Sequence, residues 1–210
     1  MGRREAQKKE RREIMLAAAH RLFERQGYAR TTFDEIAAAS GMGVATVYKY
    51  FASKQGLVAA LLELDLQRML DRAQEVIAHP PADPGRSMVK LLGAYADLGG
   101  HNWSSREILR LTVFPGLSNE GELTEFVHRA DSETRRQIST LLRHQQAAGR
   151  LHARLPVADA TAVIFALLNQ HFGEFLFDPA ASFPRMFAKL SRRVQLVFAD
   201  WRTPNKGKAS

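Results

Sequence analysis

Cysteine is absent from the chain, which excludes disulfide bonds, thiolate zinc sites and cysteine nucleophiles. No apolar run reaches the roughly 18 residues that a membrane-spanning helix needs. The charged segment 1–12 also lacks the apolar centre of a signal peptide. Together these absences predict a cytoplasmic protein with no part in a membrane.

The spacings that mark common catalytic and metal sites are absent as well. Seven histidines are present, but none forms a His-x-x-x-His or His-Glu-x-x-His pair. The chain has no Gly-x-Ser-x-Gly motif, phosphate loop or dinucleotide fingerprint. We therefore expect no metal, no cofactor and no enzymatic activity.

Basic residues exceed acidic ones, and the excess is unevenly distributed. Residues 1–56 hold 11 Lys and Arg against 6 Asp and Glu, whereas residues 57–202 hold 17 against 16. A basic segment beside a nearly neutral body indicates a polyanion as the partner of that segment. A purely solubilising charge is the alternative that composition alone leaves open.

Strict alternation of apolar and polar residues is missing, as are Asn-Gly and Asp-Gly hairpin turns, so the sequence predicts an all-α fold. Apolar residues from Met15 to Phe23 recur at helical spacing and predict a first helix over about 4–26. Gly27 is expected to end this helix in the left-handed conformation.

Residues 32–51 have the layout of a helix-turn-helix. Thr32 and Glu35 form a capping box before a short helix that stops at Gly41. A second short helix is expected over 44–50, and Ser53 is the expected N-cap of the next one. In a helix-turn-helix the second helix enters the major groove of DNA.

The outward face of the second short helix suits DNA. Lys49 offers a cation to phosphate, and Lys54 adds its charge at the start of the following helix. Thr46 and the two tyrosines offer hydroxyl groups. Val44 and Ala45 are small enough to approach base edges and to touch a thymine methyl group.

The stretch from Ala19 to Leu62 resembles the N-terminal domain of the tetracycline-repressor (TetR) family. The matching segments are Ala19–Phe23, Gly27-Tyr28, Thr31–Ala37, Ser40–Phe51 and Ser53–Leu57. The resemblance implies an all-helical homodimer with a three-helix DNA-binding domain and a C-terminal body that binds a small effector. Three positions depart from the family pattern: Gly43, Ala45 and Tyr50.

The resemblance also assigns roles by position. Thr32, Lys54 and the two tyrosines are expected to contact phosphates, and residues 44–46 and 49 to read bases or nearby phosphates. Phe51 is expected in the core, while Tyr48 suits the core and the surface equally. The candidate DNA-binding residues are Thr32, Val44, Ala45, Thr46, Tyr48, Lys49, Tyr50 and Lys54.

The C-terminal helices predict a dimer and a ligand pocket. Residues 162–168 have almost no polar face, so this helix and the one over 183–201 are expected to pair across a two-fold axis; completing a monomer core is the alternative. Ser104 and Glu107 form a second capping box. The candidate pocket residues, each of which could instead be plain core, are Tyr95, His101, Trp103, Phe114, Phe126, Phe165, His171 and Phe172.

The sequence therefore predicts three parts: a helix-turn-helix domain over 1–56, a ligand-binding and dimerisation domain over 57–202, and a disordered tail over 203–210. The expected function is a repressor released from operator DNA by a small, mostly apolar effector. An activator or a partner-controlled regulator is the alternative within this class. Outside it stands a helical enzyme or lipid-binding protein whose N-terminal motif is coincidental.

Overall fold

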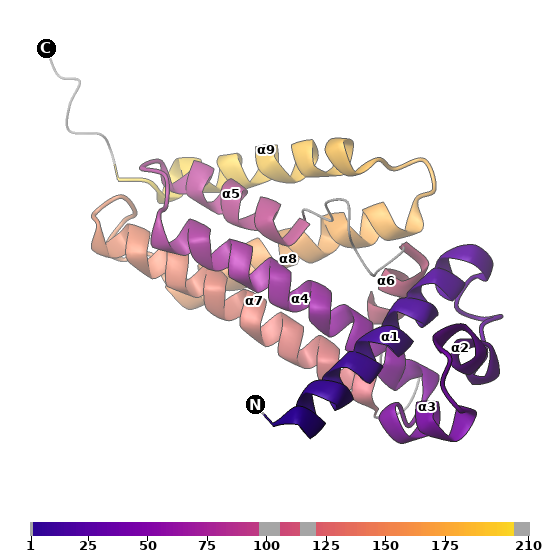
Figure 1. Ribbon diagram of the computed structural model, residues 1–210. Coiled ribbons are helices and arrows are strands. Elements are labelled where there is room, and N and C mark those ends of the chain that lie inside the picture. Colours follow the sequence, from indigo (N-terminus) through magenta and orange to yellow (C-terminus); the bar gives the residue numbers. More distant parts are fainter. Residues whose placement is uncertain (1, 97–105, 114–120, 204–210) are drawn as a thin grey trace, which may run out of the picture. The chain divides into compact units, whose positions relative to one another are not determined.

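The computed structural model describes residues 2–96, 106–113 and 121–203, which are drawn as coloured ribbon in Figure 1. Within these ranges the chain forms helices and no strand, so the predicted all-α fold is confirmed. The helices are α1 (Arg3–Gln26), α2 (Phe33–Ser40), α3 (Val44–Tyr50), α4 (Lys54–Ala78), α5 (Pro84–Ala96), α6 (Arg106–Val113), α7 (Glu122–Ala147), α8 (Val157–Phe177) and α9 (Phe183–Trp201).

The chain divides into two compact units. The first unit comprises residues 1–66 and 100–128, and the second comprises residues 67–99 and 129–210. Helices α4 and α7 therefore contribute residues to both units. The functional division at residue 56 that the sequence suggests stays a prediction.

In the first unit, α1 buries one apolar face and packs against α2, which in turn packs against α3. Met15, Ala18, Ala19, Leu22 and Phe23 are all buried, as their spacing predicts. From the other side α2 buries Phe33, Ile36 and Ala37, α3 buries Val47, and Phe51 lies in the core as expected.

The predicted ends of these helices are also present, with one correction. Thr32 and Glu35 form the capping box of α2, and Gly41 ends it in the left-handed conformation. The Ser53 hydroxyl accepts a hydrogen bond from the Gly56 amide at 2.9 Å, at the start of α4. Gly27 has a positive φ of 84°, but its ψ of 161° is extended rather than left-handed helical. The prediction for Gly27 was therefore wrong in detail, because the chain must leave α1 toward an irregular turn.

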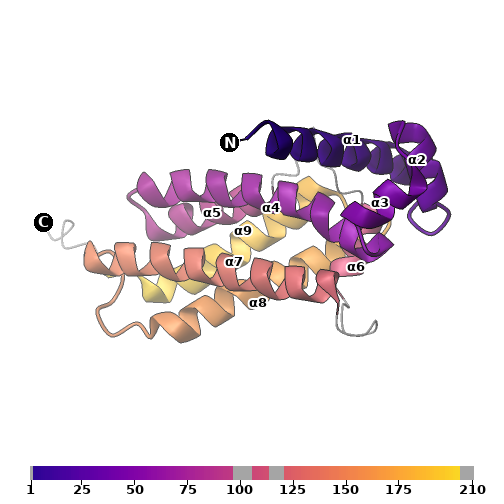
Figure 2. The same ribbon diagram turned by 60° about the horizontal axis from the view of Figure 1, so that its bottom comes forward.

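The second unit buries an apolar cluster to which α4, α5, α7, α8 and α9 all contribute. Figure 2 shows α7 and α8 running in opposite directions, joined by a short loop. Leu91, Ile138, Ile164 and Phe198 are each 0% exposed in this cluster. Polar groups within it are paired: the Tyr95 hydroxyl donates to Gln137 Oε1 at 2.9 Å.

Helix α8 is long and apolar enough to span a membrane by length and composition, and within the described residues it is the one such helix. The helix is nevertheless not one continuous apolar run, because it contains Asp159, Glu174 and the polar stretch 169–171. Seven of its side chains are buried in the second unit. Core helices of soluble proteins share this composition.

Candidate nucleic-acid interface

Helices α2 and α3 are joined by a tight turn. Gly41 supplies the left-handed residue that the turn requires, and the Met42 amide donates to the Ala37 carbonyl at 3.0 Å. Val47 anchors α3 in the core and is 0% exposed. The arrangement is that of a helix-turn-helix, with the outward side of α3 facing solvent.

The predicted DNA-binding residues fall into two groups by exposure. Thr32, Ala45, Tyr48 and Lys49 are exposed, whereas Val44, Thr46, Tyr50 and Lys54 are half-buried. Tyr48 is 57% exposed, and its ring packs edge-on against Phe33 with 4.7 Å between centroids. Because Phe33 follows Thr32, this contact ties the exposed face of α3 to the start of α2.

Thr32 is fully engaged as a helix cap. Its hydroxyl accepts from the Glu35 amide at 3.2 Å and donates to the Glu35 carboxylate at 3.0 Å. The same carboxylate accepts from the Thr32 amide at 2.8 Å and from the Gln26 side-chain amide at 3.0 Å. These hydrogen bonds, that of Gln26 first, lower the pKa of Glu35.

Lys54 lies at the start of α4 with its ammonium group turned toward the α1–α2 turn, which we define as residues 27–31. Lys54 Nζ donates to the carbonyls of Tyr28, Ala29 and Thr31 at 2.8, 3.2 and 3.0 Å. The ammonium also lies 4.4 Å from the centroid of the Tyr28 ring. The expected phosphate contact of Lys54 stays a prediction.

Glu107 of α6 holds the same turn from another side, and sequence reasoning missed it. Its Oε1 accepts from the Tyr28 amide at 3.0 Å. A side chain at Gly27 would lie 3.2 Å from the Glu107 carboxylate, so glycine also permits this approach. The capping box with Ser104 was the local interpretation of Glu107, but Ser104 lies outside the described residues. No signal in the sequence pairs positions 28 and 107.

Comparison with known proteins agrees with this geometry. The family model described as "Bacterial regulatory proteins, tetR family" matches residues 15–61, which run from the middle of α1 through the first third of α4. Residues 15–61 therefore have the sequence of a TetR-family DNA-binding domain.

Two curated helix-turn-helix transcriptional regulators illustrate the extent of the similarity. The chain is 32% identical over 89 residues to the HTH-type transcriptional regulator EthR of Mycolicibacterium smegmatis, and it spans 41% of that relative's length. It is 27% identical over 174 residues to AcrR of Shigella flexneri, which covers 81% of this chain and 80% of AcrR.

Solved structures extend the similarity to the whole fold. The transcriptional regulator FadR from Bacillus subtilis, solved in complex with stearoyl-CoA, matches with a TM-score of 0.67. The match covers 87% of this chain and 96% of FadR at 17% identity. At that identity the likeness describes the fold alone.

The predicted pocket residues have varied positions. His101, Trp103 and Phe114 lie outside the described residues. Tyr95, Phe126, Phe165 and His171 are buried, and Phe172 is half-buried. Tyr95 and Phe165 belong to the apolar cluster of the second unit. Their role as effector contacts stays a prediction.

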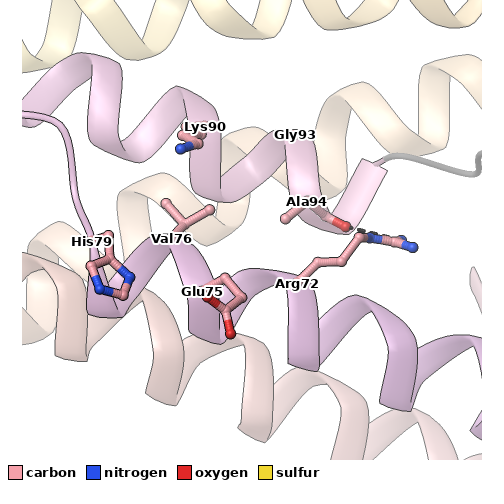
Figure 3. A pocket seen from close by; sticks show the side chains of 7 residues that line it. All are labelled: Arg72, Glu75, Val76, His79, Lys90, Gly93 and Ala94. Atoms are coloured by element: carbon pink, nitrogen blue, oxygen red, sulfur yellow. Dashed lines mark hydrogen bonds between the residues drawn. The ribbon is translucent and has the colours of Figure 1, made fainter.

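A groove of about 440 Å³ opens between α4 and α5 of the second unit (Figure 3). The Arg72 guanidinium lies at one end, where it donates to the Ala94 carbonyl at 3.3 Å, and the His79 ring lies at the other. None of the five predicted pocket residues that the structure describes is among those that line it. The lining residues are Arg72, Glu75, Val76, His79, Lys90, Gly93 and Ala94.

Proposed function

We propose that this chain is a DNA-binding transcriptional regulator, a repressor whose dimer leaves operator DNA when a small effector binds. The observation that carries the proposal is the exposed face of α3, where Ala45, Tyr48 and Lys49 point outward from a capped helix-turn-helix. The match to the family model over residues 15–61 supports the same assignment.

The proposed contacts divide by chemistry. Val44 and Ala45 present small side chains that can approach base edges, and Thr46 adds a hydroxyl group. Lys49 and the hydroxyl of Tyr48 supply donors for phosphates. Because small residues read few hydrogen bonds, part of the sequence preference would come from DNA shape.

We further propose that α8 and α9 form the homodimer interface. Three large apolar side chains on these helices remain exposed in the single chain: Val163 at 43%, Phe177 at 48% and Leu196 at 67%. Apolar surface of this kind favours burial against a second copy of the chain. Two copies would place one recognition helix in each half of a two-fold operator.

The proposed effector is a small, mostly apolar molecule. FadR, with the same fold, is described in complex with stearoyl-CoA, which has a long apolar chain. An effector can release DNA only through its difference in affinity for the DNA-bound and the free arrangement of the dimer. The candidate contacts in the C-terminal body are those predicted from the sequence.

The proposal is tested with the full-length chain and a random pool of double-stranded DNA. We expect repeated selection to enrich one two-fold symmetric motif, and binding to weaken steeply as salt rises. Lys49→Ala should raise Kd and reduce the slope of log K against log salt by about one unit. A pool that stays random, with no salt-dependent retention, would contradict DNA binding.

The dimer is tested separately by Leu196→Glu, which places a charge on the most exposed apolar residue of α9. We expect the variant to elute as a monomer at concentrations where the unmodified chain elutes as a dimer. Arg143→Glu, on an exposed polar position of α7 outside the proposed interface, is the control and should leave the elution unchanged. A dimer that persists in Leu196→Glu would place the interface elsewhere.

A further inference from the structure

The ammonium group of Lys54 has no hydrogen left for another acceptor. An ammonium carries three N–H donors, and the three carbonyls of Tyr28, Ala29 and Thr31 accept all of them, at 2.8 to 3.2 Å. The Tyr28 ring lies under the same charge at 4.4 Å. Lys54 is therefore built into the α1–α2 turn as a structural cation.

The rest of the α1–α2 turn is held by equally specific bonds. The Thr31 hydroxyl donates to the Gly27 carbonyl at 2.9 Å, and the Glu107 carboxylate accepts from the Tyr28 amide. Thr31 is only 1% exposed. The next residue along the chain is Thr32, the N-cap of α2, so the position of the turn sets where α2 begins.

A phosphate could bind Lys54 only by replacing one of these carbonyls. Two of the three hydrogen bonds, those to Tyr28 and Thr31, are partly buried. A partly buried carbonyl that loses its donor is left without a hydrogen-bond partner, and this loss opposes the exchange. The geometry therefore favours retention of the bonds to the turn when DNA is present.

We propose that Lys54 is a positioning residue for DNA binding, which acts by fixing the α1–α2 turn and the start of α2 rather than by contacting a phosphate. This inference rests on the proposed DNA-binding function. It differs from the role that the family resemblance implies for Lys54, and the two roles predict different dependences of binding on salt and on the kind of cation at position 54.

The experiment compares the full-length chain with Lys54→Met and Lys54→Arg, using duplexes recovered from the random pool. Methionine keeps an apolar stem on Tyr28 but removes the charge and all three donors. If the turn is then correctly placed only about a tenth of the time, Kd should rise about tenfold. Because no phosphate contact is lost, the slope of log K against log salt should equal that of the unmodified chain.

Lys54→Arg gives the sharper distinction, because it keeps the charge. Arginine binds phosphate at least as well as lysine, so a phosphate contact predicts equal or tighter binding. A planar guanidinium cannot direct its donors at three carbonyls as an ammonium does, so a positioning role predicts a raised Kd with an unchanged slope. Lys49→Ala provides the slope change expected when a real phosphate contact is removed.

The hydrogen-exchange rates of the Thr32 and Glu35 backbone amides report on the start of α2 without any DNA present. Faster exchange in Lys54→Met, at a temperature where circular dichroism shows the variant folded, supports the positioning role. Three results would overturn the positioning role. They are a slope reduced by about one unit in Lys54→Met, equal or tighter DNA binding by Lys54→Arg, and an unchanged Kd in both variants. Failure of the unmodified chain to bind any duplex would instead overturn the proposed function, while the exchange rates would still report whether Lys54 holds the turn.

Discussion

The α1–α2 turn and the α8–α9 pair hold their backbones by opposite means. The turn is fixed by polar groups with individual partners, above all Lys54 with three carbonyls and Glu107 with the Tyr28 amide. Helices α8 and α9 are held by apolar and aromatic packing, such as the edge-on contact of Phe175 with Phe183 at 6.0 Å between centroids.

A partly buried polar contact links α8 to α9. The Arg193 guanidinium lies 3.0 Å from His171 Nε2, and His171 Nδ1 lies 2.7 Å from the Leu167 carbonyl. Arginine can only donate, so Nε2 must accept and the ring proton must sit on Nδ1. Even here the chemistry allows one arrangement, whereas the surrounding apolar contacts tolerate exchange among similar side chains.

The comparison teaches where substitutions should be tolerated. Apolar packing depends on volume, so similar residues can replace one another at small cost. A hydrogen-bonded segment depends on the identity and placement of single atoms, so a change that removes the bonding atom should fail there even when the size of the side chain is kept. The following variants sharpen this contrast, from the largest expected effect to the smallest.

Phe198→Ala in α9 should have the largest effect. The side chain is 0% exposed and packs edge-on against Trp201 with 5.2 Å between centroids. Its removal leaves a cavity and should lower the free energy of unfolding by about 3–5 kcal/mol, measured by urea denaturation. Phe198→Leu, which keeps most of the volume, should cost less than about 1.5 kcal/mol. Equal losses in both variants would contradict the tolerance that we assign to this region.

Tyr95→Phe tests a polar bond inside the apolar unit. The hydroxyl donates to Gln137 Oε1, and Gln137 Nε2 donates to the Leu70 carbonyl at 3.0 Å. Leaving the Gln137 oxygen unpaired should cost about 1–2 kcal/mol in urea denaturation. Tyr48→Phe, at an exposed phenol, is the control and should change stability little.

The same tyrosine predicts a dependence on alkaline pH. Burial raises the pKa of Tyr95, so the folded chain favours the neutral phenol more than the unfolded chain does. This stabilisation is complete below the ordinary tyrosine pKa and is lost as pH rises above about 10. Tyr95→Phe should reduce that loss, and an unchanged alkaline profile would count against the buried hydroxyl.

Thr32→Ala removes the cap of α2 and should lower the free energy of unfolding by about 1 kcal/mol. Thr32→Ser keeps the hydroxyl that accepts from the Glu35 amide, so it should recover most of the loss. Thermal denaturation of both variants measures the difference. If serine is no better than alanine, the hydroxyl is not what stabilises this end of the helix.

Glu35→Gln should have the smallest effect on stability, because the side chain is only half-buried and solvent screens its interactions. Hydrogen bonds from Gln26 and Thr32 lower its pKa, so the stabilisation is present above the ordinary glutamate pKa. It is lost as pH falls through the lowered value. Denaturation midpoints between about pH 6 and pH 3 should therefore fall less in Glu35→Gln than in the unmodified chain.

Local signals explain why much of the first unit could be predicted. The apolar spacing of α1, the Thr32 capping box and Ser53 each act within a few residues, and all lie where the sequence indicates. Helix α3 has the predicted bounds, Val44–Tyr50. Such features depend on backbone geometry within one or two turns, which residue type largely determines.

Long-range contacts explain what the sequence did not show. The bond between Glu107 and the Tyr28 amide joins residues 79 positions apart, and that between Lys54 and Tyr28 joins residues 26 apart. The pocket residues raise a different difficulty, because helical spacing marks a side chain as buried without telling core from cavity lining. Tyr95 and Phe165 satisfy the same pattern as their apolar neighbours in the core cluster.

The contact of Glu107 with the Tyr28 amide bears on how this DNA-binding head could be transplanted. A segment cut at residue 56 would carry all three short-range motifs but would leave behind the carboxylate of α6. It would also lack Glu122, whose carboxylate packs against Gly56. A chimaeric regulator that receives this DNA-binding segment should therefore carry glutamates at the positions equivalent to 107 and 122. Without a carboxylate at position 107, the Tyr28 amide in the α1–α2 turn would lose its acceptor.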